Sequence, residues 1–282
     1  MPEFPLVSVY LPTCNRADLF ERALKSVLQQ DYPSLEVLVV DDGSENITAE
    51  KVQACCKNDP RVRWFRHEQS LGAPVARNLA ITKAQGEFIT GLDDDDEFLP
   101  GRISAFVAAA KEHQSAGFFC SGYRYQLRTG QILSGLKGAL IFDLPVLLMK
   151  NVVGNQIFIR TELLRAAGGF DPAMPACQDY DMWVRLCIQG LQGYRLPLQN
   201  YLVHLDHETP RISTSVKRQQ GQMMFVQKHQ SLLTPTQRKA QLFYAKLYAG
   251  PVSFGQILLE CPLTLWPLAV KTTLLRLAGR QV

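Results

Sequence analysis

Four consecutive aspartates, Asp93–Asp96, follow an apolar segment at residues 87–92 of this 282-residue chain. A strand that ends in several carboxylates brings like charges close together, which is unfavourable unless a cation lies among them. Carboxylate oxygens are also the ligands that Mg²⁺ and Mn²⁺ prefer in proteins. The run therefore predicts a divalent-metal site at the end of a strand, where the cation would bridge phosphate groups. The alternative is an acidic surface turn, which Pro100 and Gly101 just downstream would favour.

Two other polar segments also follow apolar, β-branched ones. Pro12–Arg16 follows residues 6–11, and Asp41–Ser44 follows residues 35–40. Between the predicted strands, apolar residues recur with helical spacing over residues 17–30, 47–57 and 73–84. This alternation predicts an α/β fold with a doubly wound, mostly parallel sheet and helices on both faces. Ligands bind outside the carboxyl ends of the strands in such sheets, so the three polar segments should meet at one edge.

The alternation becomes less regular beyond residue 115. Strands are expected near residues 118–125 and 155–160, and helices over residues 161–168, 181–189 and 216–248. Residues 252–277 are apolar but are interrupted by prolines and charged residues, which predicts a helix pair lying on the protein's own core or on a membrane face. The chain has no run of 18 apolar residues, so no membrane-spanning helix is expected.

The composition argues against several classes of protein. A net charge of +4 is too mild to indicate a nucleic-acid-binding protein, and we expect no nucleic-acid partner. The first predicted strand is not followed by G-x-G-x-x-G, and no G-x-x-x-x-G-K-[ST] occurs, so dinucleotide and P-loop chemistry have little support. Seven cysteines without a C-x-x-C pair predict reduced thiols in a cytoplasmic protein, and the N-terminus lacks the pattern of a signal peptide.

Six motifs, which stand in the family's order, make the chain resemble a family 2 glycosyltransferase with the GT-A fold, of the bacterial surface-polysaccharide type. They are Val9–Arg16, Val39–Ser44, Gly72–Ala80, Gly86–Pro100, Gly168–Asp171 and Gln178–Leu186. Most are weak signals singly, and they are specific together. The resemblance covers roughly residues 6–215. It implies an inverting, metal-dependent transfer of a sugar from a nucleotide-sugar, most often a UDP-sugar, to a glycan acceptor.

The resemblance also implies which residues hold the donor. Asp41 and Asp42 would contact the base and the ribose, because a carboxylate accepts hydrogen bonds from a uracil N–H or from hydroxyl groups. Pro12, Thr13 and Asn15 would shape the same pocket. Two positions keep structural alternatives: Asp42–Ser44 suits a simple turn with a helix N-cap. Arg77, which would reach the base or the phosphates, also suits a surface position on its helix.

Asp93 and Asp95 match the family's D-x-D element. A metal bound there, Mn²⁺ or Mg²⁺, would bridge the two phosphates and take up charge as the nucleotide diphosphate departs. All four positions are aspartate, so the assignment is ambiguous. The register of the strand end favours Asp95 as the direct metal ligand, with Asp93 or Asp94 on the ribose or in the outer shell. Asp96 is expected to be a bystander.

Asp179 occupies the family's position for the general base, which takes the proton from the attacking acceptor hydroxyl. The preceding residue is usually Glu but is Gln178 here, which removes a negative charge that would otherwise raise the pKa of Asp179. Asp181 is the alternative base, or an N-cap for the helix that follows. Two residues downstream complete the implied site. His207 would join the metal shell, unless it belongs to a simple surface turn with His204, and Arg211 would clamp a phosphate.

The resemblance divides the chain into a GT-A catalytic domain, residues 1–215, and a helical C-terminal extension, residues 216–282. Residues 1–115 would form the nucleotide-binding half and residues 116–215 the acceptor-binding half. The acceptor is expected to be a lipid-linked glycan, with residues 252–277 as a peripheral contact at the inner face of the plasma membrane. Two other functions are the alternatives: a nucleotidyltransferase, although Pro12–Arg16 lacks the glycines that this class carries, and a sugar-nucleotide-binding module without turnover.

Overall fold

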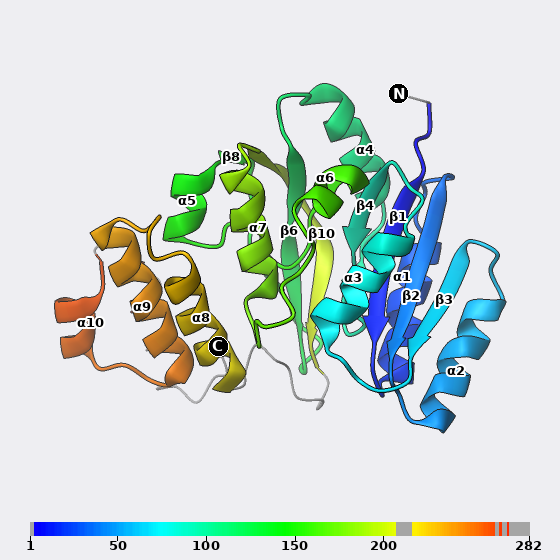
Figure 1. The fold of residues 1–282 in the computed structure, drawn as a ribbon, viewed down its shortest axis with the longest axis horizontal. Coiled ribbons are helices and arrows are strands. Elements are labelled where there is room, and N and C mark those ends of the chain that lie inside the picture. Colours follow the sequence, from blue (N-terminus) through cyan, green and yellow to red (C-terminus); the bar gives the residue numbers. More distant parts are fainter. Residues whose placement is uncertain (1–2, 207–215, 263–264, 267–269, 271–282) are drawn as a thin grey trace.

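A computed structural model describes residues 3–206 and 216–262, together with residues 265, 266 and 270 (Figure 1). The strands are β1 (Val7–Thr13), β2 (Leu35–Asp42), β3 (Val62–His67), β4 (Phe88–Gly91), β5 (Glu97–Phe98), β6 (Phe118–Leu127), β7 (Ile132–Ser134), β8 (Leu140–Phe142), β9 (Phe158–Arg160) and β10 (Gly193–Leu205). The helices are α1 (Ala17–Leu28), α2 (Asn46–Lys57), α3 (Ala73–Lys83), α4 (Arg102–Glu112), α5 (Leu144–Met149), α6 (Thr161–Ala166), α7 (Gln178–Ile188), α8 (Val216–Lys228), α9 (Pro235–Ala249) and α10 (Phe254–Glu260).

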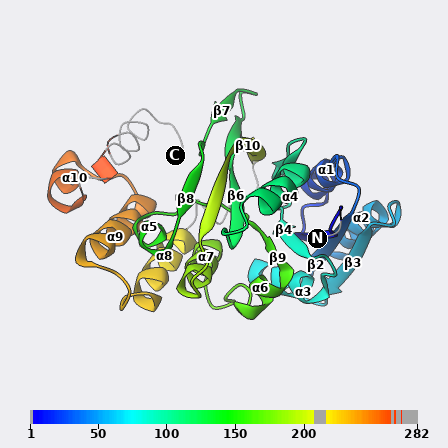
Figure 2. The same cartoon turned by 90° about the horizontal axis from the view of Figure 1, so that it is seen from above.

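One mixed sheet runs through the molecule, in the order β3-β2-β1-β4-β9-β6-β10-β5, with β7 beside β6 and β8 beside β10. The first four strands are parallel, and β1 and β2 are buried along their whole length, which explains their continuous apolar sequences. Helices α1, α2 and α4 cover one face, whereas α3, α6 and α7 cover the other (Figure 2). The predicted α/β, GT-A-like architecture with helices on both faces is confirmed.

The second half of the sheet is where the sequence was least informative. β9 runs antiparallel to both β4 and β6, and β6 is parallel to β10. Neither β10 nor α4 was expected from the sequence. β10 contains Pro197, and its pairing with β6 shifts register between Leu196 and Gln199, so it lacks the regular alternation of a simple strand.

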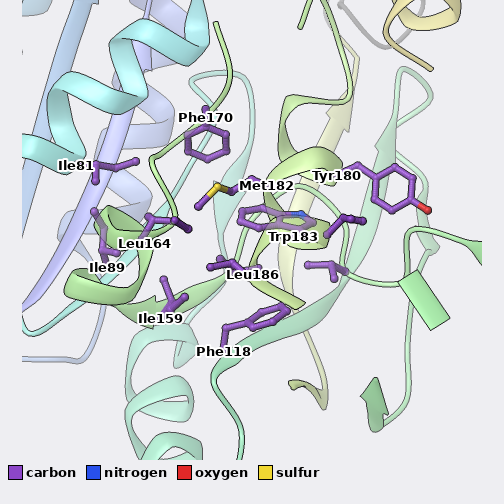
Figure 3. Packing of buried hydrophobic residues seen from close by; sticks show 14 of the residues in the cluster. Ile81, Ile89, Phe118, Ile159, Leu164, Phe170, Tyr180, Met182, Trp183 and Leu186 are labelled. Carbon is purple, nitrogen blue, oxygen red and sulfur yellow. The ribbon is translucent and has the colours of Figure 1, made fainter. Parts of the chain in front are cut away.

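Helix α7 begins at Gln178, three residues earlier than predicted, so Asp179 lies in its first turn. The apolar face of α7 packs onto the sheet: Trp183 and Leu186 are fully buried against a cluster that includes Phe118 and Ile159 (Figure 3). Because these large side chains fix the rotation of the helix, they also fix the direction in which its N-terminal turn faces.

The C-terminal region forms a separate group of helices beyond α7. The helix predicted over residues 216–248 is two helices, α8 and α9, and α9 begins at Pro235 with a capping box from Thr234. The third helix, α10, packs on α9 through a small apolar cluster. Within the part of the chain that the structure describes, no helix is long and apolar enough to cross a membrane.

Candidate active site

The carboxyl ends of β1, β2 and β4 meet at one edge of the sheet, as the sequence predicts. Thr13, the last residue of β1, lies opposite Asp41 of β2, and Pro12 lies opposite Val40. The backbone N–H of Leu92 donates to the carbonyl oxygen of Tyr10 at 3.0 Å, which carries the pairing of β4 with β1 up to the aspartate run. The three polar segments are therefore neighbours in space.

Asp41 is completely buried at this edge. Its Oδ1 accepts a hydrogen bond from the backbone N–H of Ser44 at 2.9 Å. Among the described residues, its Oδ2 has no hydrogen-bond partner, and Nε of Arg66 lies 3.7 Å away from it. A buried carboxylate oxygen without a donor is unfavourable, so this atom is suited to accept an N–H or O–H from a bound ligand.

Asp42 anchors the loop that precedes α3. Its carboxylate accepts from the backbone N–H groups of Leu71 and Gly72 at 3.0 and 2.8 Å and from the Ser70 hydroxyl at 2.8 Å, and it lies 2.7 Å from Nδ1 of His67. Burial raises the pKa of Asp42, but the hydrogen bonds, led by the one with His67, outweigh burial and lower it. The described contacts of Asp42 thus organise a loop, and its contact with a base or ribose stays a prediction.

Asn15 joins the segment after β1 to the segment after β2. Its side-chain oxygen accepts from the backbone N–H of Glu45, and its own backbone N–H donates to the hydroxyl of Ser44, both at 2.8 Å. Its φ of +55° is in the left-handed region that asparagine tolerates better than most residues. Asn15 therefore fixes two loops together, and its part in shaping a donor pocket stays a prediction.

Asp94 is buried behind the edge and is held from two sides. The hydroxyl of Thr13 donates to its Oδ2 at 2.7 Å, and Arg16 donates through Nε at 3.1 Å while its Nη2 pairs with Oδ1. Burial raises the pKa of Asp94 to about 7, with Asp95 and Asp93 adding to the rise although Arg16 lowers it. With its hydrogen bonds made inside the protein, Asp94 supports the site from behind.

Asp93 faces a second arginine. Nη2 of Arg77 donates to its Oδ1 at 2.7 Å, and Nε2 of Gln156 donates to the same oxygen at 3.1 Å. Gln156 in turn accepts from the hydroxyl of Tyr10 at 2.7 Å. Arg77, which had been left open as a surface residue, thus points into the site, where it fixes the orientation of Asp93.

The G-G-F-D motif supports Arg77 from outside. The guanidinium carbon of Arg77 lies 5.2 Å from the ring centre of Phe170, within the range of a cation–π contact. The side chain of Asn78 bonds both the N–H and the C=O of Phe170, at 2.8 and 2.7 Å. Gly169 has φ +68°, and a Cβ there would lie 2.4 Å from Oδ1 of Asn78, so only glycine fits this close approach.

Asp95 and Asp96 differ sharply in what surrounds them. Asp96 is fully buried and accepts from the hydroxyl of Tyr201 at 3.0 Å and from the backbone N–H of His204 at 3.1 Å. Oδ2 of Asp95 lies 3.5 Å from Nη1 of Arg16. Asp96 joins the run to β10 and has the structural surroundings expected of a bystander, whereas Asp93 and Asp95 have the more exposed side chains.

These residues fit a divalent cation by the chemistry of their donor atoms. Asp93 and Asp95 offer hard carboxylate oxygens two residues apart. Each is paired with an arginine, Asp93 with Arg77 and Asp95 with Arg16. Among the residues that the structure describes, no three His, Cys, Asp or Glu side chains are already gathered as a metal site. His207 and Arg211 lie outside the described residues.

Asp179 belongs to the same site. It lies half-buried in the first turn of α7, close enough to Arg77 and Asp93 for both to act on its charge. Burial raises the pKa of Asp179 to about 6, while the backbone N–H of Tyr180 and the charge of Arg77 oppose the rise. A carboxylate with this pKa is ionised near neutral pH and still accepts a proton readily, which suits a general base.

Asp181 is not the N-cap that the sequence left open, whereas its role as the alternative base stays a prediction. The N-cap of α7 is Cys177, and Asp181 is a fully buried residue inside the helix. It lies 2.9 Å from Nε2 of His229, from Nζ of Lys228 and from Nε of Arg185. Burial raises its pKa, but these three partners outweigh burial and lower the pKa to about 2. Asp181 ties α7 to the helix α8 that follows it.

A profile described as "Glycosyl transferase family 2" matches residues 8–164, which is more than half of the chain. The chain belongs to this family. The family 2 match runs from β1 to α6, and so includes Asp41, Asp42 and Asp93–Asp96 at the ends of β2 and β4. It ends before α7, where Asp179 lies.

Relatives of this glycosyltransferase include two that are named for colanic acid and teichuronic acid biosynthesis. It is 33% identical over 249 residues to the putative colanic acid biosynthesis glycosyl transferase WcaA of Escherichia coli (strain K12), covering 86% of this chain and 88% of that one. It is 30% identical over 193 residues to the putative teichuronic acid biosynthesis glycosyltransferase TuaG of Bacillus subtilis (strain 168), covering 67% and 75%.

Solved structures with the same fold include glycosyltransferases with bound nucleotide-sugars. S. aureus TarS 1-349 in complex with UDP-GlcNAc aligns with a TM-score of 0.67 at 19% identity, over 95% of this chain and 79% of that one. The mannosyltransferase PcManGT from Pyrobaculum calidifontis, in complex with GDP-Man and Mn²⁺, aligns with a TM-score of 0.62 at 19% identity, over 100% and 77%. At this identity the likeness shows the fold.

Three residues of the site were not singled out from the sequence of this glycosyltransferase. Arg16 was noted only as part of a motif, and Tyr10 and Gln156 were read as strand residues. One signal pointed to the last two: Gly91 precedes the aspartate run, and a Cβ there would lie 2.0 Å from the Tyr10 ring and 2.3 Å from Oε1 of Gln156. The glycine therefore marks a place where two side chains cross the end of β4.

Proposed function

We propose that this family 2 glycosyltransferase moves a sugar from a UDP-sugar to a glycan acceptor with inversion at the anomeric carbon. The observation that carries the proposal is that Asp93 and Asp179 lie close to Arg77, at the edge of the sheet where β2 ends in Asp41 and Asp42. This edge of the sheet carries three kinds of carboxylate. Asp41 can accept a hydrogen bond from the nucleobase, Asp93 and Asp95 can hold a cation for the diphosphate, and Asp179 has a raised pKa. Residues 1–115 bind the nucleotide, and residues 116–215 bind the acceptor.

The nucleotide lies at the ends of β1 and β2. Asp41 accepts from the N–H of uracil through Oδ2, which has no hydrogen-bond partner among the described residues. Thr13 and Asn15 fix the segments after β1 and β2 through hydrogen bonds to Asp94 and to the backbone of Glu45. Because these groups are already ordered without a ligand, little conformational entropy is lost when the base binds.

The diphosphate would lie beside Asp93 and Asp95, which would hold Mn²⁺ or Mg²⁺. The cation supplies neutralisation of the diphosphate and stabilises it as a leaving group. Arg77 contributes positive charge at the same place while it positions Asp93. Arg211 and His207 are proposed to add to the phosphate and metal contacts.

Asp179 takes the proton of the acceptor hydroxyl. In an inverting transfer the oxygen attacks C1 from the face opposite the phosphate, so a single base on the acceptor side is sufficient. The side chain of Asp179 is directed by a helix whose rotation is set by the buried Trp183 and Leu186 (Figure 3). The carboxylate of Asp179 is therefore already oriented before the transfer.

Donor choice is tested by a thermal-shift screen. With Mn²⁺ present, UDP-sugars at about 100 times their Kd are expected to raise the melting temperature by about 5 °C or more, because a ligand stabilises by RT ln(1+[L]/Kd). Asp41→Asn should remove most of the shift for UDP while the protein alone melts unchanged or higher. A larger shift with guanosine, cytidine or thymidine diphosphates would overturn the UDP assignment.

The acceptor is a lipid-linked glycan at the cytoplasmic face of the membrane, and α10 touches that membrane. Phe254, Leu258 and Leu259 of α10 are 49%, 63% and 80% exposed, whereas Ile257 is buried against α9. A short helix with one face in the protein and the other face apolar and exposed suits an interfacial contact. The membrane contact is proposed to involve residues 252–277 as a whole.

Replacement of Leu258 and Leu259 by serine is expected to weaken binding to vesicles of anionic phospholipid by about tenfold, because two large apolar side chains lose their burial in the bilayer. Co-sedimentation measures the change. Ile47→Ser is the matched control: Ile47 is 75% exposed on α2, at the opposite end of the molecule (Figures 1 and 2). Equal binding of the double variant, the control and the wild type would contradict the membrane contact.

A further inference from the structure

Arg16 contacts two carboxylates of the aspartate run, Asp94 and Asp95, and the proposed donor binding does not explain why it contacts both. Two of its nitrogens hold Asp94, one of them at 3.1 Å, and the hydroxyl of Thr13 completes that site. Its third nitrogen, Nη1, lies 3.5 Å from Oδ2 of Asp95. One arginine therefore bridges a buried supporting carboxylate and the carboxylate proposed to hold the cation.

The two contacts differ in strength. Asp94 has a side chain that is 1% exposed and receives a fork of donors, so its contact with Arg16 is firm. A separation of 3.5 Å exceeds the usual N–H···O distance, which makes the contact with Asp95 a loose ion pair. The side chain of Arg16 is itself 27% exposed. Arg16 can thus exchange its partner at Asp95 at small cost while the rest of its fork stays in place.

We propose that Arg16 is an exchangeable counterion of the active site. Before the donor binds, it neutralises Asp95; when a divalent cation takes Asp95, Nη1 of Arg16 stays in place and donates to the diphosphate that enters with the cation. A guanidinium suits both partners, because carboxylate and phosphate oxygens accept the same planar arrangement of donors. The proposal rests on the donor and metal site proposed above and adds a positioning role for a residue to which no role was assigned.

The exchange has a thermodynamic consequence. A cation that binds alone must take Asp95 from Arg16 and leave Arg16 without its second partner, so it should bind weakly. When UDP is present, the guanidinium gains phosphate oxygens, so the cation should bind more tightly. The coupling is reciprocal: the factor by which UDP strengthens cation binding equals the factor by which the cation strengthens UDP binding.

The test measures the affinity for Mn²⁺ alone by electron paramagnetic resonance, in Asp94→Asn and in Asp94→Asn/Arg16→Gln. Asparagine stands at position 94 in both proteins, so that the loss of Arg16 does not leave a buried carboxylate without the partner that holds it. We expect the double variant to bind Mn²⁺ about tenfold more tightly than the single variant, since the competitor of the cation is gone. Saturating UDP should strengthen Mn²⁺ binding at least tenfold in Asp94→Asn but threefold or less in the double variant.

Arg22→Gln in the Asp94→Asn background is the matched control. Arg22 lies in the same place but donates to the backbone oxygen of Asp95 and pairs with Glu97, so its loss should change Mn²⁺ affinity less than threefold. Equal Mn²⁺ affinity in the single and double variants, or equal strengthening by UDP, would overturn the exchange while leaving the site itself intact. Unchanged Mn²⁺ binding in Asp95→Asn would instead reject the metal site, and with it this role of Arg16.

Discussion

Asp179→Asn is expected to lower kcat for sugar transfer by about 10³-fold and to leave the affinity for the nucleotide-sugar within about threefold of the wild type. The asparagine keeps the size of the side chain but cannot accept the proton of the acceptor hydroxyl. Donor binding depends instead on Asp41 and the aspartate run, which the substitution does not touch. Transfer is measured as UDP release in the presence of acceptor, and binding by calorimetry. Transfer at the wild-type rate would remove Asp179 from the mechanism.

The same carboxyl sets the pH dependence of transfer. Burial raises the pKa of Asp179 to about 6, so below that pH the group holds a proton and kcat should fall about tenfold per pH unit. Stability follows the opposite sign: ionisation is easier in the unfolded chain, so the charge of Asp179 costs stability as the pH rises from about 4 through 6. Asp179→Asn should therefore melt no lower than the wild type at pH 7, which separates lost chemistry from lost folding.

Two further variants sharpen this test. Gln178→Glu restores the family's usual acidic residue, whose charge should move the acidic limb of the rate profile to higher pH. Asp181→Asn should act on stability instead, because it removes the buried carboxylate that pairs with His229 and Lys228. An unchanged limb in Gln178→Glu would mean that another group sets it.

Asp95→Ala is expected to cause the largest loss of activity among single replacements of Asp93–Asp96, about 10³-fold at saturating Mn²⁺. Asp96→Ala should act mainly on folding, since the buried hydroxyl of Tyr201 and the backbone N–H of His204 would lose their acceptor. Two such losses cost about 3 kcal/mol together, or roughly 5–10 °C in melting temperature. Rates and melting curves of the four variants provide the comparison.

The controls for the aspartate series lie within the run. Asp94→Asn keeps the shape of a residue that Thr13 and Arg16 already hold, and its loss of activity should fall between those of Asp95 and Asp96. Asp93→Ala should also loosen Arg77, which donates to it. Similar losses of activity at all four positions would mean that the run acts as a diffuse negative charge, and the assignment of Asp95 would be wrong.

The sequence predicts well that the carboxyl ends of β1, β2 and β4 lie together, because that part of the chain obeys local rules. Each of β1, β2 and β4 is a short apolar segment followed at once by polar residues, and parallel strands bring their ends together. What the sequence could not supply was the pairing across the edge. Arg16 and Asp94 are 78 residues apart, and Gln156 and Asp93 are 63 apart, so neither contact leaves a local pattern.

The second half of the fold was predicted less well for physical reasons that can be named. Helix α7 begins at Gln178, and its N-cap is Cys177, whose φ is +59°; because no Ser, Thr, Asp or Asn caps the helix, the sequence predicts its start too late. β10 carries a proline and a register shift, which hide the alternation of a strand. The early start of α7 matters most, because it places Asp179 in the first helical turn.

The most direct test of the central claim, a cation held by the aspartate run against the diphosphate of the donor, is ³¹P nuclear magnetic resonance of bound UDP. Mn²⁺ added at low occupancy should broaden the signals of both phosphates strongly in the wild type, because paramagnetic relaxation falls steeply with distance from the cation. The same addition to Asp95→Asn should leave the signals of bound UDP narrow. Equal broadening in the two proteins, or none in the wild type, would contradict the proposed site.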